Sequence, residues 1–193
     1  MANRDNHYEA AFEQYLRRSR VPYVAVDEAR RSIAADGSLK SLDFIVSPPG
    51  STAWLVDVKG RRFPSGDGQK QYWKNWSTRD DLDSLTRWEG LFGKGFGGLL
   101  VFAYLVVGRR APLSPERLCE FRGNLYGFVG VRLSDYMAAA RPISPSWDTL
   151  AMPTARFRQR ARAMDVFLKI ERPQPTVGEP MPTGEVAGPA VAK

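Results

Sequence analysis

Two aspartates and a lysine stand inside apolar stretches, where charged side chains are unusual. Asp43 lies in segment 41–46, and Asp57 and Lys59 lie in segment 54–60. Both segments are rich in apolar and β-branched residues and are bounded by Pro, Gly and Ser, which predicts two strands. Side chains at positions i and i+2 share a strand face, so Asp57 and Lys59 should point the same way. Charged groups buried on a sheet must pair or bind a metal, so a plain salt bridge is one interpretation and a metal site is the other.

Between these segments, the five residues Ser-Pro-Pro-Gly-Ser at 47–51 have the composition of a tight turn. Proline presets the first turn angle and glycine supplies the less common one. The two strands are therefore predicted to form a hairpin. That hairpin would bring Asp43 close to the patch that carries Asp57 and Lys59.

Asp43 followed by Asp57-Val58-Lys59 resembles the D…(D/E)-x-K signature of the PD-(D/E)XK nuclease superfamily, which includes Holliday-junction resolvases and many restriction endonucleases. Leu42 stands where the superfamily name has proline. The resemblance covers about residues 6–107 and depends on order: an acidic helix, a strand with Asp, a strand with D-x-K, a helix and another strand. It implies an α/β fold with a restriction-endonuclease-like αβββαβ core, in which helices flank a central mixed sheet.

The resemblance also implies a metal site and its cofactor, Mg²⁺ or Mn²⁺, which prefer hard oxygen ligands. Lys59 would orient or help to deprotonate the attacking water and would screen charge on the phosphate. Whether one or two ions act is left open. The implied catalytic residues are Glu9, Asp43, Asp57 and Lys59, and the implied metal ligands are Glu9, Asp43, Asp57 and the backbone carbonyl of Val58.

The acidic helix is predicted over residues 6–19, where Tyr8, Phe12, Tyr15 and Leu16 recur at helical spacing. Two of its glutamates, Glu9 and Glu13, are four residues apart and so lie one turn apart on a common side. The resemblance favours Glu9 as the metal ligand, because its spacing from Leu16 is like that in resolvases. The alternative is that both glutamates are solvated helix acids.

Further elements follow from periodicity and from turn signals. Thr78 and Asp81 are spaced as a capping box for a helix that begins at about residue 79. Segment 97–107 is an almost continuous apolar run, which is typical of a buried central strand. The remaining predictions are an edge strand at 21–26, an irregular segment at 27–37, a flexible basic loop at 61–68, a helix at 79–92, a strand at 125–133, and helices at 134–141 and 154–170.

The charge of the chain points to an anionic partner. The 193 residues carry a net charge of +7, and the pI is about 9.7, which favours nucleic acid before a membrane surface. DNA is the expected partner and RNA remains possible. The aromatic segment 69–76 either stacks on bases or anchors the core. The candidate nucleic-acid-binding residues are Arg61, Arg62, Lys70, Lys74, Arg156 and Arg160.

Composition excludes several other classes of protein. One cysteine, Cys119, and one histidine, His7, cannot build the usual zinc sites or an intrachain disulfide. Cys119 is interpreted as a core residue. The first residues lack a signal-peptide core, and the longest apolar run is far too short for a membrane span, so we expect a soluble cytoplasmic protein. One domain over residues 1–171 and a disordered Pro/Gly-rich tail at 172–193 are predicted.

The hypothesis that follows is a metal-dependent endonuclease, a hydrolase that cleaves phosphodiester bonds of DNA. A ribonuclease and a non-catalytic nucleic-acid-binding domain on the same fold are the alternatives. A structural or interaction protein, in which Asp57 and Lys59 form only a salt bridge, is a third possibility. The oligomeric state is left open, with a homodimer as one option.

Overall fold

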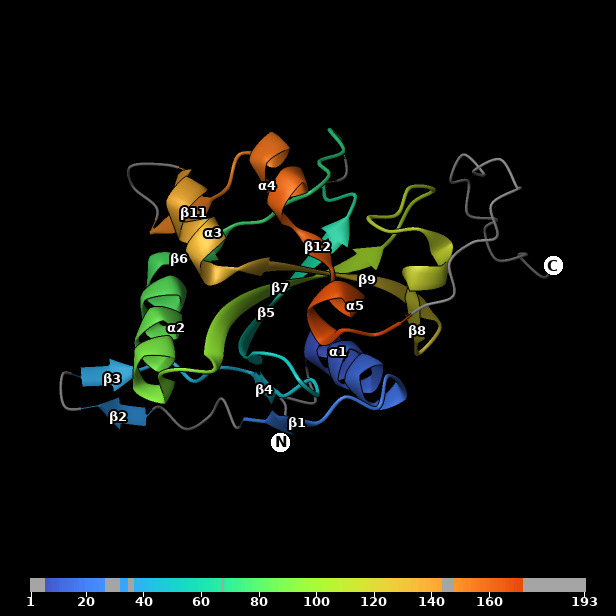
Figure 1. The fold of residues 1–193 in the computed structure, drawn as a ribbon. Helices are drawn as coiled ribbons and strands as arrows, with labels where there is room; N and C mark the ends of the chain where they lie inside the picture. The colour runs from blue at the N-terminus through green and yellow to red at the C-terminus, as the bar shows by residue number, and fades with distance from the viewer. Residues whose placement is uncertain (1–5, 27–31, 35–36, 67, 144–147, 172–193) are drawn as a thin grey trace.

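The protein is built around a central seven-stranded sheet (Figure 1). The structure is a computed structural model, and it describes residues 6–26, 32–34, 37–66, 68–143 and 148–171. β5 and β7 pair in parallel and the neighbouring pairs are antiparallel, so the sheet is mixed. In spatial order its strands are β1 (Tyr23–Ala25), β4 (Phe44–Val46), β5 (Ala53–Phe63), β7 (Phe96–Val106), β9 (Asn124–Arg132) and β12 (Arg162–Ala163), and β8 (Cys119–Phe121) also pairs with β9.

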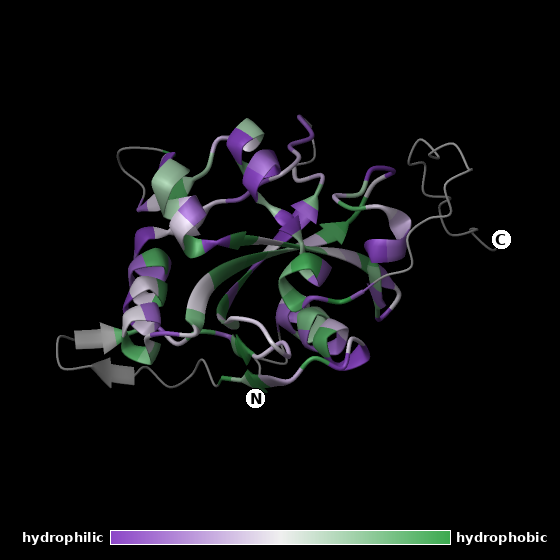
Figure 2. Cartoon of the chain, in the orientation of Figure 1, coloured by the Kyte–Doolittle hydropathy of each residue, from purple (hydrophilic) through white to green (hydrophobic). Residues whose placement is uncertain are grey.

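The three strands on which the resemblance depends, β4, β5 and β7, lie side by side in the sheet, as predicted. β4 and β5 form the expected hairpin, with Phe44 opposite Val56, and β5 pairs with β7 along its whole length. The strands of the central sheet are predominantly hydrophobic (Figure 2). β1 lies at the sheet edge, where the sequence placed an edge strand.

Two helices begin with the capping signals that the sequence carries. In α1 (His7–Arg18), the side chain of Asn6 accepts a hydrogen bond from the Tyr8 N–H at 3.1 Å. α2 (Arg79–Phe92) connects β5 to its parallel neighbour β7. It starts with the predicted capping box, in which Thr78 and Asp81 each accept a bond from the other's backbone N–H, at 3.1 and 3.2 Å.

The helices cover the two faces of the sheet separately (Figure 1). α1 and α5 (Met164–Leu168) pack on one face, where Phe12 and Phe167 belong to the same buried cluster as Val56. α2 and α3 (Leu133–Ala139) pack on the other face, where Leu82 and Tyr136 join Leu55. We call these the α1 face and the α2 face.

Shorter elements surround this core. β2 (Ser32–Ala34) and β3 (Gly37–Leu39) form a hairpin, which falls largely within the segment predicted to be irregular. A second sheet joins β10 (Arg141–Pro142), β11 (Thr149–Ala151) and β6 (Ser77–Thr78). The 3-10 helix η1 (Pro115–Arg117) and α4 (Thr154–Arg160) complete the described elements.

Two further predictions of secondary structure were wrong. The helix expected at 154–170 is divided into α4 and α5, because Ala161 adopts an extended conformation and the next two residues pair with β9. The flexible basic loop expected at 61–68 starts later, because β5 continues to Phe63 along its pairing with β7. Arg61 and Arg62 therefore lie in a strand.

Some predictions fall outside the described residues. The tail at 172–193 and part of the 27–37 segment are among them. Within the described part, no helix has the length and apolar character needed to cross a membrane. Cys119 is 6% exposed and lies in the buried cluster of the α1 face, which confirms its interpretation as a core residue.

Candidate active site

The side chain of Lys59 joins strand β5 to helix α2. Its Nζ lies 2.8 Å from Asp57 Oδ2 and 2.8 Å from Asp81 Oδ2. Asp57 and Lys59 share the α2 face with Leu55, as the alternation of strand side chains predicted. The exposed fractions of the three charged side chains are only 12–15%. The expected Asp57–Lys59 ion pair is therefore present, but it is part of a larger cluster.

Asp81 is the residue of this cluster that sequence reasoning missed. Besides Lys59 and the capping bond, it accepts a bond from Lys40 Nζ at 2.8 Å. The sequence showed its local role, because the capping box depends on a fixed three-residue spacing. Its contacts with Lys40 and Lys59 come from packing of α2 on the sheet, and no local spacing encodes them.

Asp43 lies where the β4–β5 ladder ends. It is 6% exposed, and its Oδ2 accepts a bond from the Val58 N–H at 2.5 Å. Continuing the register of Phe44 opposite Val56 by one residue would put Asp43 opposite Asp57. The structure thus places Asp43 against the backbone of the Asp57-Val58-Lys59 motif.

Glu9 lies on the buried side of α1, with 2% of its surface exposed, and it accepts a hydrogen bond from the Asn6 side chain. α1 covers the α1 face, whereas Asp57 and Lys59 point to the α2 face. Within the described residues, no three His, Cys, Asp or Glu side chains are grouped so that they could hold a metal ion. The expected convergence of Glu9 with Asp43 and Asp57 is therefore not present in this arrangement.

Glu13, the other candidate of the first helix, has different partners. Its Oε1 lies 2.7 Å from Arg17 Nη2 and accepts a bond from the Tyr23 hydroxyl at 2.9 Å. His7 lies away from these groups, with its Nδ1 2.8 Å from the Tyr126 hydroxyl. Glu13 and His7 therefore bind neighbouring side chains and do not contact Asp57 or Lys59.

A cavity of about 20 Å³ adjoins the charged cluster, and Lys40, Asp57, Asp81 and Trp88 are among its lining residues. A volume of this size holds roughly one water molecule or one ion. Carboxylate oxygens are the donors that hard divalent cations prefer. The donor chemistry beside Asp57 and Asp81 therefore fits Mg²⁺ or Mn²⁺, although these two aspartates alone supply only part of a ligand set.

Burial and ion pairing shift the pKa values of the cluster in different directions. Burial raises the pKa of Asp57, and the Lys59 ammonium offsets only part of this effect. Burial would also raise the pKa of Asp81, but Lys59 and the bond from Lys40 outweigh it and hold that pKa well below its usual range. For Lys59, burial alone would lower the pKa, yet Asp57 and Asp81 together raise it above its usual value. Lys59 is therefore an ammonium at neutral pH.

Arg61 is also held by its neighbours. Its guanidinium donates to the Gly60 carbonyl at 2.7 Å and to the Trp76 carbonyl, and its Cζ lies 3.8 Å from the centre of the Trp76 ring. Burial lowers the pKa of Arg61. Arg62, by contrast, is exposed on the same strand.

The other predicted nucleic-acid contacts are spread over two segments. Lys70 is exposed and Lys74 is half-buried in the segment before β6. Arg156 is exposed on α4, and Arg160 Nη1 lies 3.4 Å from Asp135 Oδ1. They do not share one element, so a nucleic acid would have to span several elements to contact all of them.

Segment 69–76 was predicted either to anchor the core or to stack on bases, and each interpretation fits one of its two tryptophans. Trp73 packs edge-on against Phe63 and Tyr104, with ring centres 5.3 and 5.9 Å away, as a core anchor does. Trp76 is 38% exposed under the Arg61 guanidinium and is accessible for stacking.

The mixed sheet, its flanking helices and the Asp-containing hairpin together define a resolvase-like or restriction-endonuclease-like fold, as the resemblance implied. A solved structure with this arrangement is Hjc, a Holliday junction resolvase from the archaeal hyperthermophile Archaeoglobus fulgidus. The two structures superpose with a TM-score of 0.50 at 10% sequence identity, over 84% of this chain and 98% of that chain. No protein-family model and no curated protein matches the sequence.

Proposed function

We propose that this chain is a metal-dependent endonuclease that hydrolyses phosphodiester bonds of DNA. The observation that carries the proposal is the group of Asp57, Lys59 and Asp81 beside an ion-sized cavity on a resolvase-like fold. Burying charged side chains is costly, and a buried acid whose pKa is raised is typical of functional sites. The net charge of +7 suits a phosphate-rich substrate.

The residues proposed to hold Mg²⁺ or Mn²⁺ are Asp43, Asp57 and the Val58 carbonyl, with Glu9 completing the set. A divalent cation bound there would supply positive charge for the phosphate and the leaving oxygen. Asp43 and Val58 are already joined by a hydrogen bond from the Val58 N–H to the Asp43 carboxylate. Glu9 is the member that must approach from the α1 face, so its participation is the most demanding part of the proposal.

Lys59 is proposed to stabilise charge rather than to remove a proton. Two carboxylates keep its ammonium protonated at neutral pH. An ammonium donates hydrogen bonds and has no acceptor, so it can orient a water through the water's oxygen and stabilise the negative phosphoryl oxygens. Asp81 is proposed as a positioning residue, because it holds the lysine against α2.

The proposed DNA contacts are Arg61, Arg62, Lys70, Lys74, Arg156 and Arg160. Phosphate contacts of this kind fix position without reading sequence. Arg62, Lys70 and Arg156 are the members whose side chains are exposed and form no hydrogen bond or ion pair within the described residues. Arg61 would first have to leave its two carbonyl partners.

A non-catalytic nucleic-acid-binding domain is the second candidate. One specific observation favours it: the ammonium groups of Lys59 and Lys40 together balance the charges of Asp57 and Asp81, so the cluster is electrostatically satisfied as it stands. Such a domain would bind DNA without cleaving it.

The test is a cleavage assay on circular, linear and branched DNA and on RNA, with and without Mg²⁺ or Mn²⁺. Wild type is compared with Asp57→Ala and with Asp83→Ala, a control that removes an exposed aspartate of α2. We expect metal-dependent DNA cleavage that is lost in Asp57→Ala and kept in the control. DNA binding without cleavage would support the second candidate, and cleavage of RNA alone would indicate a ribonuclease.

A further inference from the structure

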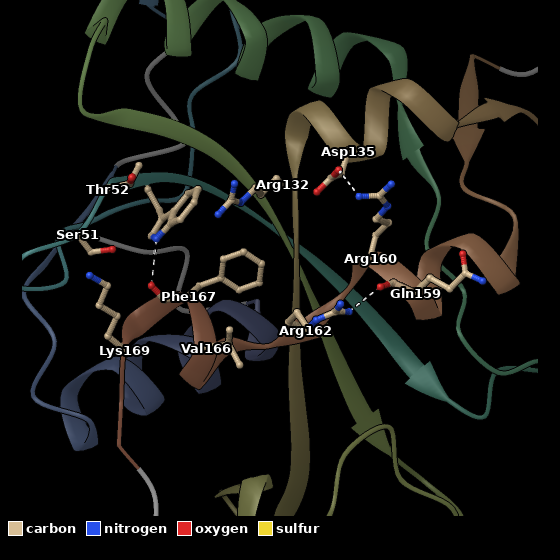
Figure 3. A pocket seen from close by; sticks show the side chains of 11 residues that line it. Ser51, Thr52, Arg132, Asp135, Gln159, Arg160, Arg162, Val166, Phe167 and Lys169 are labelled. Atoms are coloured by element: carbon tan, nitrogen blue, oxygen red, sulfur yellow. Dashed lines mark hydrogen bonds and ion pairs between the residues drawn. The ribbon is translucent and has the colours of Figure 1, made fainter.

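A second and much larger cleft, of about 540 Å³, opens where β5 begins and β9 ends (Figure 3). The β4–β5 turn, the end of β9 and the segment from α4 to α5 all contribute to it. The lining residues that carry the argument are Trp54, Arg132, Arg162, Val166, Phe167 and Lys169.

Positive charge dominates the lining of this cleft. Four cations, Arg132, Arg160, Arg162 and Lys169, face one carboxylate, Asp135, which lies 3.4 Å from Arg160. The guanidinium of Arg162 donates to two backbone carbonyls of its own segment, at 2.6 and 2.8 Å, and Lys169 Nζ donates to the Gly50 carbonyl at 2.7 Å. Across the described part of the chain, Arg132, Arg162 and Lys169 have no carboxylate partner, so their convergence favours an anionic ligand.

One wall of the cleft is apolar and firmly held. The rings of Trp54 and Phe167 meet edge to face at 5.5 Å, and Trp54 Nε1 donates to the Phe167 carbonyl at 3.2 Å. The Arg132 guanidinium lies 5.7 Å from the Trp54 ring centre, and Val166 is 55% exposed at the rim. A ligand there would meet cations on one side and an apolar surface on the other.

This cleft is separate from the cluster around Lys59. Trp54 and Phe167 belong to the buried cluster of the α1 face, whereas Lys59 binds Asp81 of α2 on the opposite face. The cleft and the cavity beside Lys59 have no lining residue in common. A ligand in the cleft therefore need not be the phosphate group that Asp57 and Lys59 would act on.

We infer that the cleft binds a phosphate ester of about nucleotide size. Its volume lies in the range of small-ligand pockets, and guanidinium groups bind phosphate oxygens with paired, charge-assisted bonds. The phosphates would lie at Arg132, Arg162 and Lys169, and the organic part would lie against Phe167 and Val166. A free nucleotide and a 5′-phosphorylated strand end share this chemistry.

Calorimetry on the full chain in EDTA tests the inference without involving metal-dependent cleavage. The probes are ATP, inorganic tripolyphosphate, and a short single-stranded oligonucleotide with and without a 5′-phosphate. The double variant Arg132→Gln/Arg162→Gln is compared with Arg87→Gln/Lys94→Gln, which removes two exposed charges elsewhere. Unliganded thermal midpoints check folding, and Arg162→Gln alone repeats the test if the double variant unfolds.

We expect saturable binding of ATP that weakens about tenfold or more in the cleft variant and stays within about twofold in the control, whose charges lie outside the cleft. Binding of the 5′-phosphorylated oligonucleotide, but not of the unphosphorylated one, would identify a strand end as the ligand. Binding of ATP without binding of either oligonucleotide would identify a free nucleotide. No saturable binding of any phosphate probe, or equal weakening in both double variants, would overturn the inference. Tripolyphosphate binding as tight as that of ATP would overturn the role of the apolar wall.

Discussion

Asp57 and Asp81 contact the same ammonium, yet we expect very different effects on stability when each is replaced by Asn. Folding raises the pKa of Asp57, so its ionised form lowers the unfolding free energy at neutral pH. Folding lowers the pKa of Asp81, so its ionised form stabilises the protein. The difference arises from partners: Asp81 also binds Lys40 and caps α2.

The magnitudes follow from these contacts. Asp81→Asn weakens two bonds to ammonium groups at 2.8 Å. Each such bond is worth about 1.5–3 kcal/mol, but the bond to Lys40 contributes less, because the Lys40 side chain is 38% exposed to solvent. The capping bond can be kept by Asn, so a loss of about 2–4 kcal/mol is expected. Asp57→Asn removes one contact of Lys59 but also a buried charge, and Asp81 still neutralises the lysine. We expect a change within about 1 kcal/mol.

The pH dependence gives an independent check on the sign. The deficit of Asp81→Asn should be complete above the unfolded pKa of an aspartate, about 4, and should vanish as pH falls through the lower folded pKa. For Asp57, the cost of ionisation is present above the raised folded pKa and disappears as the pH falls through it. Acidification should therefore stabilise wild type relative to Asp57→Asn.

The assay pairs urea unfolding without metal, at neutral and mildly acidic pH, with the Mg²⁺-dependent cleavage rate. The proposed site predicts that Asp57→Asn loses cleavage by orders of magnitude, since it loses the charge that holds the cation, while its stability hardly changes. A loss of about 3 kcal/mol or more in Asp57→Asn, with wild type inactive, would show that the cluster is a structural salt bridge and would refute the reasoning.

Three further predictions use matched pairs or a single exposed charge. Glu9→Gln should abolish cleavage and Glu13→Gln should keep most of it, measured as the Mg²⁺-dependent rate; the reverse result would reassign the ligand. Gly60→Ala should lower the unfolding free energy by about 1–3 kcal/mol, because the added Cβ would lie 2.1 Å from a tyrosine ring of α1. Gly90→Ala is the matched control: Gly90 has open space around it in α2, so this variant should raise the unfolding free energy by about 0.5–1 kcal/mol. Arg62→Glu should weaken DNA binding alike for all sequences and reduce its salt dependence; unchanged affinity in a salt titration would place the DNA elsewhere.

The sequence predicted the core of the fold because its signals are local. The alternation around Asp57, the turn at 47–51 and the capping box at Thr78 each act within a few residues, and the structure contains all three features. The missed features depend on distant contacts. Arg162 and Ala163 leave a helical pattern because β9 offers them a strand edge, and Asp81 joins the charged cluster only when α2 docks.

The relation between α1 and β5 connects Glu9, a proposed ligand, to the rest of the site. Gly60 directly follows Lys59, and the ring of Tyr8 lies so close to it that a Cβ at this position would clash with the ring. Because Glu9 follows Tyr8, this close approach brings the start of α1 to the strand position next to Lys59, although from the other face. The missing side chain at Gly60 is what permits the approach. If Glu9 contributes to a metal site, it must therefore reach it near the end of the β4–β5 ladder, where Asp43 already bonds to Val58, and not by crossing the continuous part of the sheet.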